Sequence, residues 1–209
     1  MYFNRSRYVG HPLLDELRVR KNELLQSGKI AFMPGSRRAE ISRLMPIFRE
    51  VASRIKDKEK LLVVPPFLAN EIQIYGDVSG FSVVTDAPRA LLQSEFAFIC
   101  SGTATLQAAL VGTPFVLAYK AKAIDIMIAR MFVKLRHIGL ANIIFDFMGE
   151  AALHEELLQE EVTPSNLIKA YESCDKKKFI AGCERLRRYL KHGSAANVAQ
   201  ILTTKKDEK

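Results

Sequence analysis

Short apolar segments alternate with amphipathic ones along the first 120 residues. The apolar segments predict five strands, at 29–33, 61–64, 81–84, 96–100 and 114–118, and most of them are apolar throughout. Apolar positions at helical spacing lie between them, for example Ile41, Leu44 and Phe48. Continuously apolar strands separated by helices are typical of a parallel sheet covered on both faces. We therefore predict an α/β fold, a Rossmann-like parallel sheet with helices on both faces.

Helical patterns continue after the strand signals fade beyond Tyr119. Pro46 has no N–H group and is expected to kink or restart its helix near Met45. Thr163 and Pro164 form a typical helix start, and Asp175 opens a further helix that is expected to close at Gly193. The expected helices are 17–27, 41–55, 69–75, 87–93, one ending at 111, 123–135, 153–160, 165–173 and the segment from Asp175 to Gly193.

Two small polar turns follow predicted strands. Gly35–Arg38 comes after the first strand, and Ser101–Thr103 comes after the fourth. A turn of this kind before a helix leaves backbone N–H groups and the positive end of the helix dipole free to bind phosphate. Because the carboxyl ends of parallel strands share one edge of the sheet, both turns should open there, and an arginine beside glycine can clamp phosphate oxygens. Taken singly, the first turn is better explained as a glycine turn with two solvated arginines.

Further polar residues are expected at the same edge. Gln107 lies four residues after Thr103 on one helix face, where its amide could reach sugar hydroxyls beyond the phosphates. Tyr119 and Lys120 close the fifth strand, although Tyr119 also fits a core position. Neither G-x-x-x-x-G-K-[ST] nor G-x-G-x-x-G occurs, which disfavours ATP hydrolysis and ordinary dinucleotide binding.

The composition of the chain limits the classes of ligand and partner that it is expected to bind. The 209 residues carry a formal net charge of +8, which favours nucleic acid, an acidic lipid surface or a phosphorylated small molecule. The chain has no tryptophan and no interleaving of basic and aromatic residues, so nucleic acid is disfavoured. Its three cysteines and four histidines lack metal-site spacing, and a reducing cytoplasm fits the cysteines. We expect no signal peptide and no membrane span, because no apolar run reaches about 18 residues.

Longer motifs follow one another in a fixed order along nearly the whole chain. They are YVGHPLLD at 8–15, MPGSRRAEI at 33–41, SGTATLQAAL at 101–110, TPFV at 113–116 with AYK at 118–120, LANII at 140–144, and ELLQE at 156–160 followed by Thr163-Pro164. In this order the motifs resemble the bacterial lipid-A-disaccharide synthase family.

The resemblance implies the GT-B architecture, in which two Rossmann-like domains face each other and the second binds the sugar nucleotide. The chain is similar to that second half. The resemblance also implies the domain organisation, which is an interdomain linker segment at 1–16, a Rossmann-like UDP-sugar-binding domain at 17–175 and a C-terminal helical extension at 176–209. The acceptor-binding half with its carboxylate base is expected to be absent, so no catalytic residue is expected in this chain. The chain is therefore predicted to bind donor without turnover by itself.

The family's reaction is an inverting transfer of 2,3-diacylglucosamine from UDP to 2,3-diacylglucosamine 1-phosphate, without metal or other cofactor. Two positions depart from the family's motifs. Gln107 stands where the family has Glu, which weakens the expected ribose contact, and Ala141 stands where the family has Pro. The substrate-binding residues that the resemblance implies are Gly35, Ser36, Arg37, Ser101, Gly102 and Thr103 for the diphosphate, with Gln107, Tyr119, Asn142, Gln159 and Glu160 around them.

Other interpretations stay open. The chain could belong to another UDP-sugar enzyme of similar fold, such as an epimerase or a peptidoglycan glycosyltransferase, or be a non-catalytic basic module that binds nucleotides or RNA. Segment 121–135 is either a core helix or a basic amphipathic helix for an anionic membrane. The expected partners are the two acylated sugar substrates, the missing N-terminal domain, the inner face of the inner membrane and a second copy of the chain. The helix cations are Lys120, Lys122, Arg130 and Lys134, whereas the basic residues of 176–191 are expected to form a solvated face.

Overall fold

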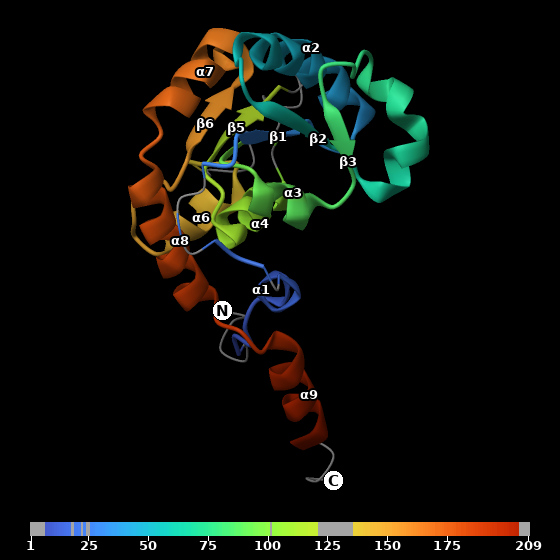
Figure 1. Cartoon of the computed structure of the whole chain (residues 1–209). Helices are drawn as coiled ribbons and strands as arrows, with labels where there is room; N and C mark the ends of the chain where they lie inside the picture. Colours follow the sequence, from blue (N-terminus) through green and yellow to red (C-terminus); the bar gives the residue numbers. More distant parts are fainter. Residues whose placement is uncertain are drawn as a thin grey trace.

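One parallel sheet forms the centre of the computed structural model (Figure 1). The structure describes residues 7–17, 19–21, 23, 26–100, 102–120 and 136–204, and within them the strand order is β3-β2-β1-β4-β5-β6. All strand pairs are parallel, and this is the Rossmann order. The strands are β1 (Lys29–Met33), β2 (Glu59–Val63), β3 (Ser82–Val84), β4 (Phe96–Ile99), β5 (Phe115–Tyr119) and β6 (Glu155–Leu158).

Helices cover both faces of this sheet. The helical elements are α1 (Pro12–Glu16), α2 (Arg38–Arg54), the 3₁₀ segment η1 (Pro66–Tyr75), α3 (Ala87–Gln93), α4 (Thr103–Val111), α6 (Leu140–Phe147), the 3₁₀ turn η2 (Gln159–Glu161), α7 (Pro164–Ser173), α8 (Lys176–Leu190) and α9 (Ser194–Thr204). The apolar residues of α3, α4, α6 and α8 form one core, and those of α2, η1 and α7 form the other.

The two cores explain why the central strands β1, β4 and β5 are buried and apolar at nearly every position. Ala31 and Met33 of β1 face the first core, while Ile30 and Phe32 face the second, and all four are buried. Successive side chains of a strand point to opposite faces, so a sheet covered twice requires apolar residues at every position. The predicted α/β fold with helices on both faces is confirmed.

The prediction of a helix at 153–160 was wrong, because this segment contains the sixth strand. β6 runs parallel to β5, with Leu157 opposite Ala118 and Leu158 opposite Tyr119. Leu157 is buried in the second core, whereas Glu155 is exposed. The sequence EELLQEE is rich in residues with high helix propensity, but propensity is a weak preference that tertiary pairing overrides. Here the free edge of β5 supplies the backbone partners.

Two other helix predictions also differ from the structure. The described residues within 17–27 are not helical, and the short helix α1 precedes them. Tertiary bonds hold this segment, since the Lys21 N–H donates to the Val111 carbonyl over 2.7 Å and the Lys21 ammonium donates to the Ser94 carbonyl. Pro46 lies inside α2, which continues without a break because residues on both sides of it, including Phe48, pack on the sheet.

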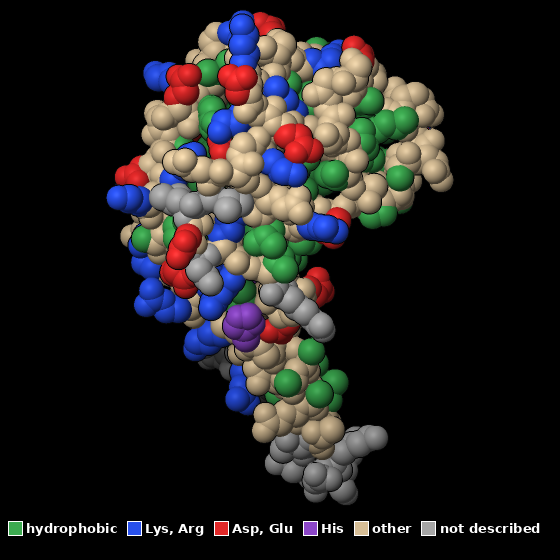
Figure 2. Space-filling model, in the orientation of Figure 1, with side chains coloured by type: hydrophobic (Ala, Val, Ile, Leu, Met, Phe, Trp, Pro, Cys, Tyr) green, Lys and Arg blue, Asp and Glu red, His purple; other side chains and the backbone are tan. Residues whose placement is uncertain are grey.

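The last two helices differ in how they contact the sheet. α8 contributes Phe179, Leu186 and Leu190 to the first core, whereas α9 extends away from the sheet (Figure 1). The Asp15 carboxylate ties the start of α9 to α1, because it accepts hydrogen bonds from the N–H groups of Gly193 and Ser194 at 2.8 and 2.7 Å. Figure 2 shows Lys and Arg side chains gathered along the edge formed by α8. The exposed cations there are Lys177, Lys178, Arg185 and Arg188.

Candidate functional site

A cleft opens where the strand order reverses. β1 and β4 are neighbours in the sheet. From β1 the chain continues to β2 and β3 on one side, and from β4 it continues to β5 and β6 on the other side. The carboxyl ends of β1 and β4 therefore form the switch point at which ligands bind in such folds. We call this volume of about 500 Å³ the switch-point cleft. The two polar turns open into it, as the sequence predicted. Its lining comprises Met33, Gly35, Ser36, Arg37, Glu40, Val63, Pro65, Pro66, Phe67, Thr85, Ala87, Cys100, Gly102, Thr103 and Ala104.

The α4 end of the cleft presents the first backbone N–H groups of that helix. Gly102 is the N-cap of α4, with φ +123° and ψ −162°, a conformation that is essentially restricted to glycine. A Cβ atom added to Gly102 would meet no described heavy atom within 4 Å. Among the described residues no side chain caps this terminus, and the first turn of α4 has no acidic residue. The positive end of the dipole therefore faces open space that suits an anion. Ser101 lies outside the described residues.

The β1 end of the cleft contributes a tethered arginine. Arg37 donates to the Glu40 carboxylate over 2.7 Å, with 79% of its side chain exposed against 10% for Glu40. This hydrogen bond raises the pKa of the Arg37 guanidinium. Gly35 has φ +96°, which favours glycine, and a Cβ there would lie 2.6 Å from Glu40 Oε2, so a larger residue would also require the Glu40 carboxylate to shift. The guanidinium thus stays charged and keeps donors for a ligand.

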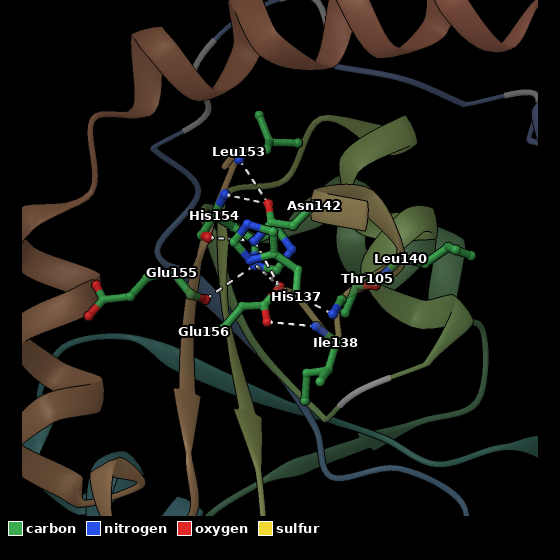
Figure 3. Close-up of polar contacts among 10 residues, drawn as sticks. Thr105, His137, Ile138, Leu140, Asn142, Leu153, His154, Glu155 and Glu156 are labelled. Atoms are coloured by element: carbon green, nitrogen blue, oxygen red, sulfur yellow. Dashed lines mark hydrogen bonds and ion pairs between the residues drawn. The ribbon is translucent and has the colours of Figure 1, made fainter. Parts of the chain in front are cut away.

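Asn142 has a different position from the one that the family motif implied. Its side chain is fully buried, and its amide donates to the His154 carbonyl at 2.9 Å and to Glu156 Oε1 at 2.8 Å (Figure 3). Its oxygen accepts from the N–H groups of Leu153 at 2.8 Å and His154 at 3.2 Å. Asn142 is absent from the lining of the switch-point cleft. Its amide fixes the junction of α6 and β6.

Sequence reasoning missed the carboxylate that completes this junction. Glu156 accepts hydrogen bonds from the N–H groups of Ile138 at 2.9 Å and Gly139 at 3.1 Å, just before α6 begins. Its charge therefore compensates the positive end of the α6 dipole from within the protein. Among the described residues no carboxylate lies in the first turn of α4, so of these two helices α4 is the one whose N-terminus suits an external anion. No sequence signal identified this role of Glu156, because its contacts depend on the pairing of β6 with β5.

The remaining predicted residues lie on α4, on β5 and on η2, the turn that follows β6. Gln107 is half-buried on α4, and Tyr119 ends β5. Gln159 and Glu160 directly follow β6, whose carboxyl end shares the edge of the sheet with the cleft. Gln159 has φ +55°, and its Nε2 atom is buried without a hydrogen-bond partner in the described part of the chain, a combination that is frequent at functional positions. These four residues do not line the switch-point cleft itself, and their contact with substrate stays a prediction.

The described part of the chain contains neither a metal-binding cluster nor a membrane-spanning helix. There, no group of three or more His, Cys, Asp or Glu residues is placed to hold a metal ion. The cysteines Cys100, Cys174 and Cys183 form no disulfide with any described residue. No described helix has the length and apolarity needed to cross a bilayer. Residues 121–135, which include the predicted membrane-binding helix, lie outside the described residues.

His154 should make the fold sensitive to acid. Burial lowers its pKa to about 3, whereas an exposed histidine titrates near 6.5. The unfolded chain then binds more protons between these values, so stability is complete above about pH 6.5 and falls as the pH decreases. When the pH is lowered from about 7.5 to about 5.5, the free energy of unfolding should decrease in both proteins. We expect the decrease to be about 1.4 kcal/mol smaller in His154→Phe than in the wild type. Urea unfolding at both pH values measures this.

The exposed His192 supplies the control for the acid experiment. His192 is 68% exposed and lies 3.3 Å from an Asp15 carboxylate oxygen, and the acid sensitivity of His192→Gln should stay closer to that of the wild type than that of His154→Phe does. Equal acid sensitivity of the His154→Phe variant and the wild type would contradict the assignment to His154.

Solved structures with the same fold define the class of protein. The glycotransferase of kitacinnamycin matches 90% of this chain and 45% of its own length, with a TM-score of 0.54 and 16% identity. The spinosyn rhamnosyltransferase matches 88% of this chain and 48% of its own length, with a TM-score of 0.50 and 13% identity. The chain thus has the Rossmann-like fold of GT-B glycosyltransferases, with a cleft at the switch point.

Sequence comparison gives the particular family. A model of the lipid-A-disaccharide synthetase family matches residues 2–202, and the chain belongs to this family. It is 54% identical over 210 residues to the lipid-A-disaccharide synthase of Campylobacter jejuni and 46% identical over 212 residues to that of Helicobacter pylori. These alignments cover 96% and 95% of this chain but only 57% and 59% of the relatives. The chain therefore spans less than two thirds of their length.

Proposed function

We propose that this chain is the donor-binding half of a lipid-A-disaccharide synthase. The whole enzyme transfers 2,3-diacylglucosamine from UDP-2,3-diacylglucosamine to 2,3-diacylglucosamine 1-phosphate with inversion. The observation that carries the proposal is the pairing of the α4 N-terminus with Arg37 in one cleft at the switch point. Family membership selects the ligand class, because both relatives are named lipid-A-disaccharide synthase.

The chemistry assigned to this half is stabilisation of the leaving group. When the bond from the anomeric carbon to the diphosphate breaks, negative charge develops on the departing UDP. Gly102, Thr103 and Arg37 line one cleft, where the backbone N–H groups and the guanidinium can stabilise that charge. Glu40 is the one carboxylate among the described residues that line the cleft, and Arg37 already holds it. The base for the acceptor 6-hydroxyl therefore belongs to the part of the relatives that this chain does not match.

Two parts of this proposal concern surfaces. The substrates carry acyl chains, so attachment to an anionic membrane surface suits the reaction, with the exposed cations of α8 as described candidates in addition to segment 121–135. A homodimer is a further prediction. Vesicle sedimentation and analytical ultracentrifugation measure these two properties.

UDP binding tests the proposal directly. UDP at about 100 times its Kd should raise the Tm of the chain by about 5–10 °C, and oligonucleotides should not. Arg37→Met should weaken UDP binding about 10- to 100-fold, because charge-assisted hydrogen bonds to phosphate are lost. Calorimetric titration of both proteins measures the change in Kd.

The neighbouring arginine provides a matched control. Arg38 pairs with Glu71 and does not line the switch-point cleft, so Arg38→Met should change the Kd for UDP by less than about threefold. Donor binding would be refuted if the chain did not bind UDP, or if oligonucleotides raised its Tm as much as UDP does. Turnover by this chain with both substrates would refute the assignment of the base to the other half.

A further inference from the structure

A single buried hydroxyl connects the N-termini of two helices. Thr105 lies in the first turn of α4 and is fully buried. Its Oγ1 donates to the Gly102 carbonyl over 2.8 Å. The same oxygen accepts from the Leu140 N–H over 3.1 Å (Figure 3). Leu140 is the first residue of α6. A hydroxyl has one proton to donate, and Thr105 donates it to the Gly102 carbonyl. Its oxygen then accepts the hydrogen bond from the first N–H group of α6.

The bond to Gly102 sets the direction of the next N–H group. The Gly102 carbonyl receives two bonds from inside the fold, from Thr105 Oγ1 and from the Thr105 N–H at 3.2 Å. In a planar trans peptide, the carbonyl and the N–H of the following residue point in opposite directions. With the Gly102 carbonyl held inward, the Thr103 N–H is directed outward, and Gly102 and Thr103 both line the switch-point cleft.

The other side of Thr105 is anchored to a hydrogen-bonded junction. Leu140 follows Ile138 and Gly139, whose N–H groups donate to Glu156, and Glu156 also receives the amide of Asn142. The Glu156 side chain is 8% exposed, so few waters compete for these bonds. The Gly102 turn is thereby connected through Thr105 to a fixed point at β6.

We propose that Thr105 is a positioning residue of the phosphate site. It contacts no ligand itself but orients the Thr103 N–H toward the diphosphate of a nucleotide sugar and holds the α4 N-terminus in register with α6. This inference rests on the proposed function, because it requires the switch-point cleft to bind a diphosphate.

The test compares three variants in UDP titration. Thr105→Val keeps the shape but removes both hydrogen bonds, and it should weaken UDP binding about tenfold or more. Thr105→Ser keeps the hydroxyl and should bind within about twofold of the wild type. Thr113→Val is the matched control, because Thr113 is also buried next to α4 and its hydroxyl donates to the Leu91 carbonyl over 2.6 Å. Thr113→Val should lower the Tm comparably and leave the Kd unchanged.

The outcomes separate this inference from the proposed function. If the wild type does not bind UDP, the proposed function fails. If the wild type binds UDP and Thr105→Val binds equally well, or if Thr113→Val loses as much affinity, the positioning role is wrong and donor binding stands. Should the valine variant not fold, Thr105→Cys replaces it, because a thiol keeps the volume but hydrogen-bonds weakly, and the same two outcomes decide.

Discussion

Replacing Asn142 with Asp is expected to lower the free energy of unfolding by about 4 kcal/mol at neutral pH. The substitution conserves the shape and the two bonds from the Leu153 and His154 N–H groups. It replaces the donating nitrogen with an oxygen that faces Glu156 Oε1 and the His154 carbonyl, which lie 2.8 and 2.9 Å from that nitrogen. Two buried carboxylates would then face each other without a proton between them. Urea denaturation of the wild type and the variant measures the difference.

Acid should restore part of that stability. A proton shared between the introduced carboxyl group and Glu156 is held more tightly in the folded variant than in its unfolded chain. The pKa of the pair is therefore raised on folding, so the stability of the variant relative to the wild type increases as the pH falls toward about 5.

A second asparagine serves as the control for this substitution. The amide of Asn166 also donates to a backbone carbonyl, that of Glu161 at 2.9 Å, but this hydrogen bond is exposed and lies at the first turn of α7, where a negative charge is favourable. Asn166→Asp should therefore cost less than about 1 kcal/mol. If Asn142→Asp also lowered the free energy of unfolding by less than about 1 kcal/mol, the structural role of Asn142 would be contradicted. A loss in Asn142→Asp that did not depend on pH would contradict it as well.

The position of the two polar turns at one cleft could be predicted from the sequence because it depends on local features. Gly35 and Gly102 closely follow apolar strands, and the parallel sheet brings their turns to one edge without further information. Both glycines have positive φ angles, which glycine adopts readily. The switch-point cleft was thus predictable from residues that are close to one another in the sequence.

The other side of the site was not predictable, because it depends on pairing between distant segments. Glu156 acts on α6 only because β6 pairs with β5, and the predicted helix at 153–160 would have placed it elsewhere. Asn142 carries a family motif, but whether its amide faces a ligand or the protein depends on which groups surround it. Those groups come mainly from β6 and the residues just before it. Family motifs identified important positions here without distinguishing substrate contacts from support.

Gly102 is the position where one methyl group should remove UDP binding. A Cβ at Gly102 would meet no described heavy atom within 4 Å, so Gly102→Ala produces no clash with the described part of the fold. The methyl would instead project at the α4 N-terminus, where we propose that phosphate oxygens approach the N–H groups. The φ of +123° also disfavours alanine, so the turn would change shape at some cost in stability. We expect the Kd for UDP to rise on the order of 100-fold, about 2.7 kcal/mol, in calorimetric titration.

Substitution of Gly149 is the control, because it produces backbone strain without placing a methyl group in the proposed phosphate site. Gly149 also has a positive φ, +71°, and a Cβ there would also meet no described heavy atom within 4 Å, but it follows α6 and does not line the switch-point cleft. Gly149→Ala should therefore lower stability by about 1 kcal/mol and leave the Kd for UDP within about twofold of the wild type. If Gly102→Ala bound UDP as well as Gly149→Ala does, the diphosphate would not lie on the α4 N-terminus. The Arg37 end of the cleft would then have to hold it without those N–H groups.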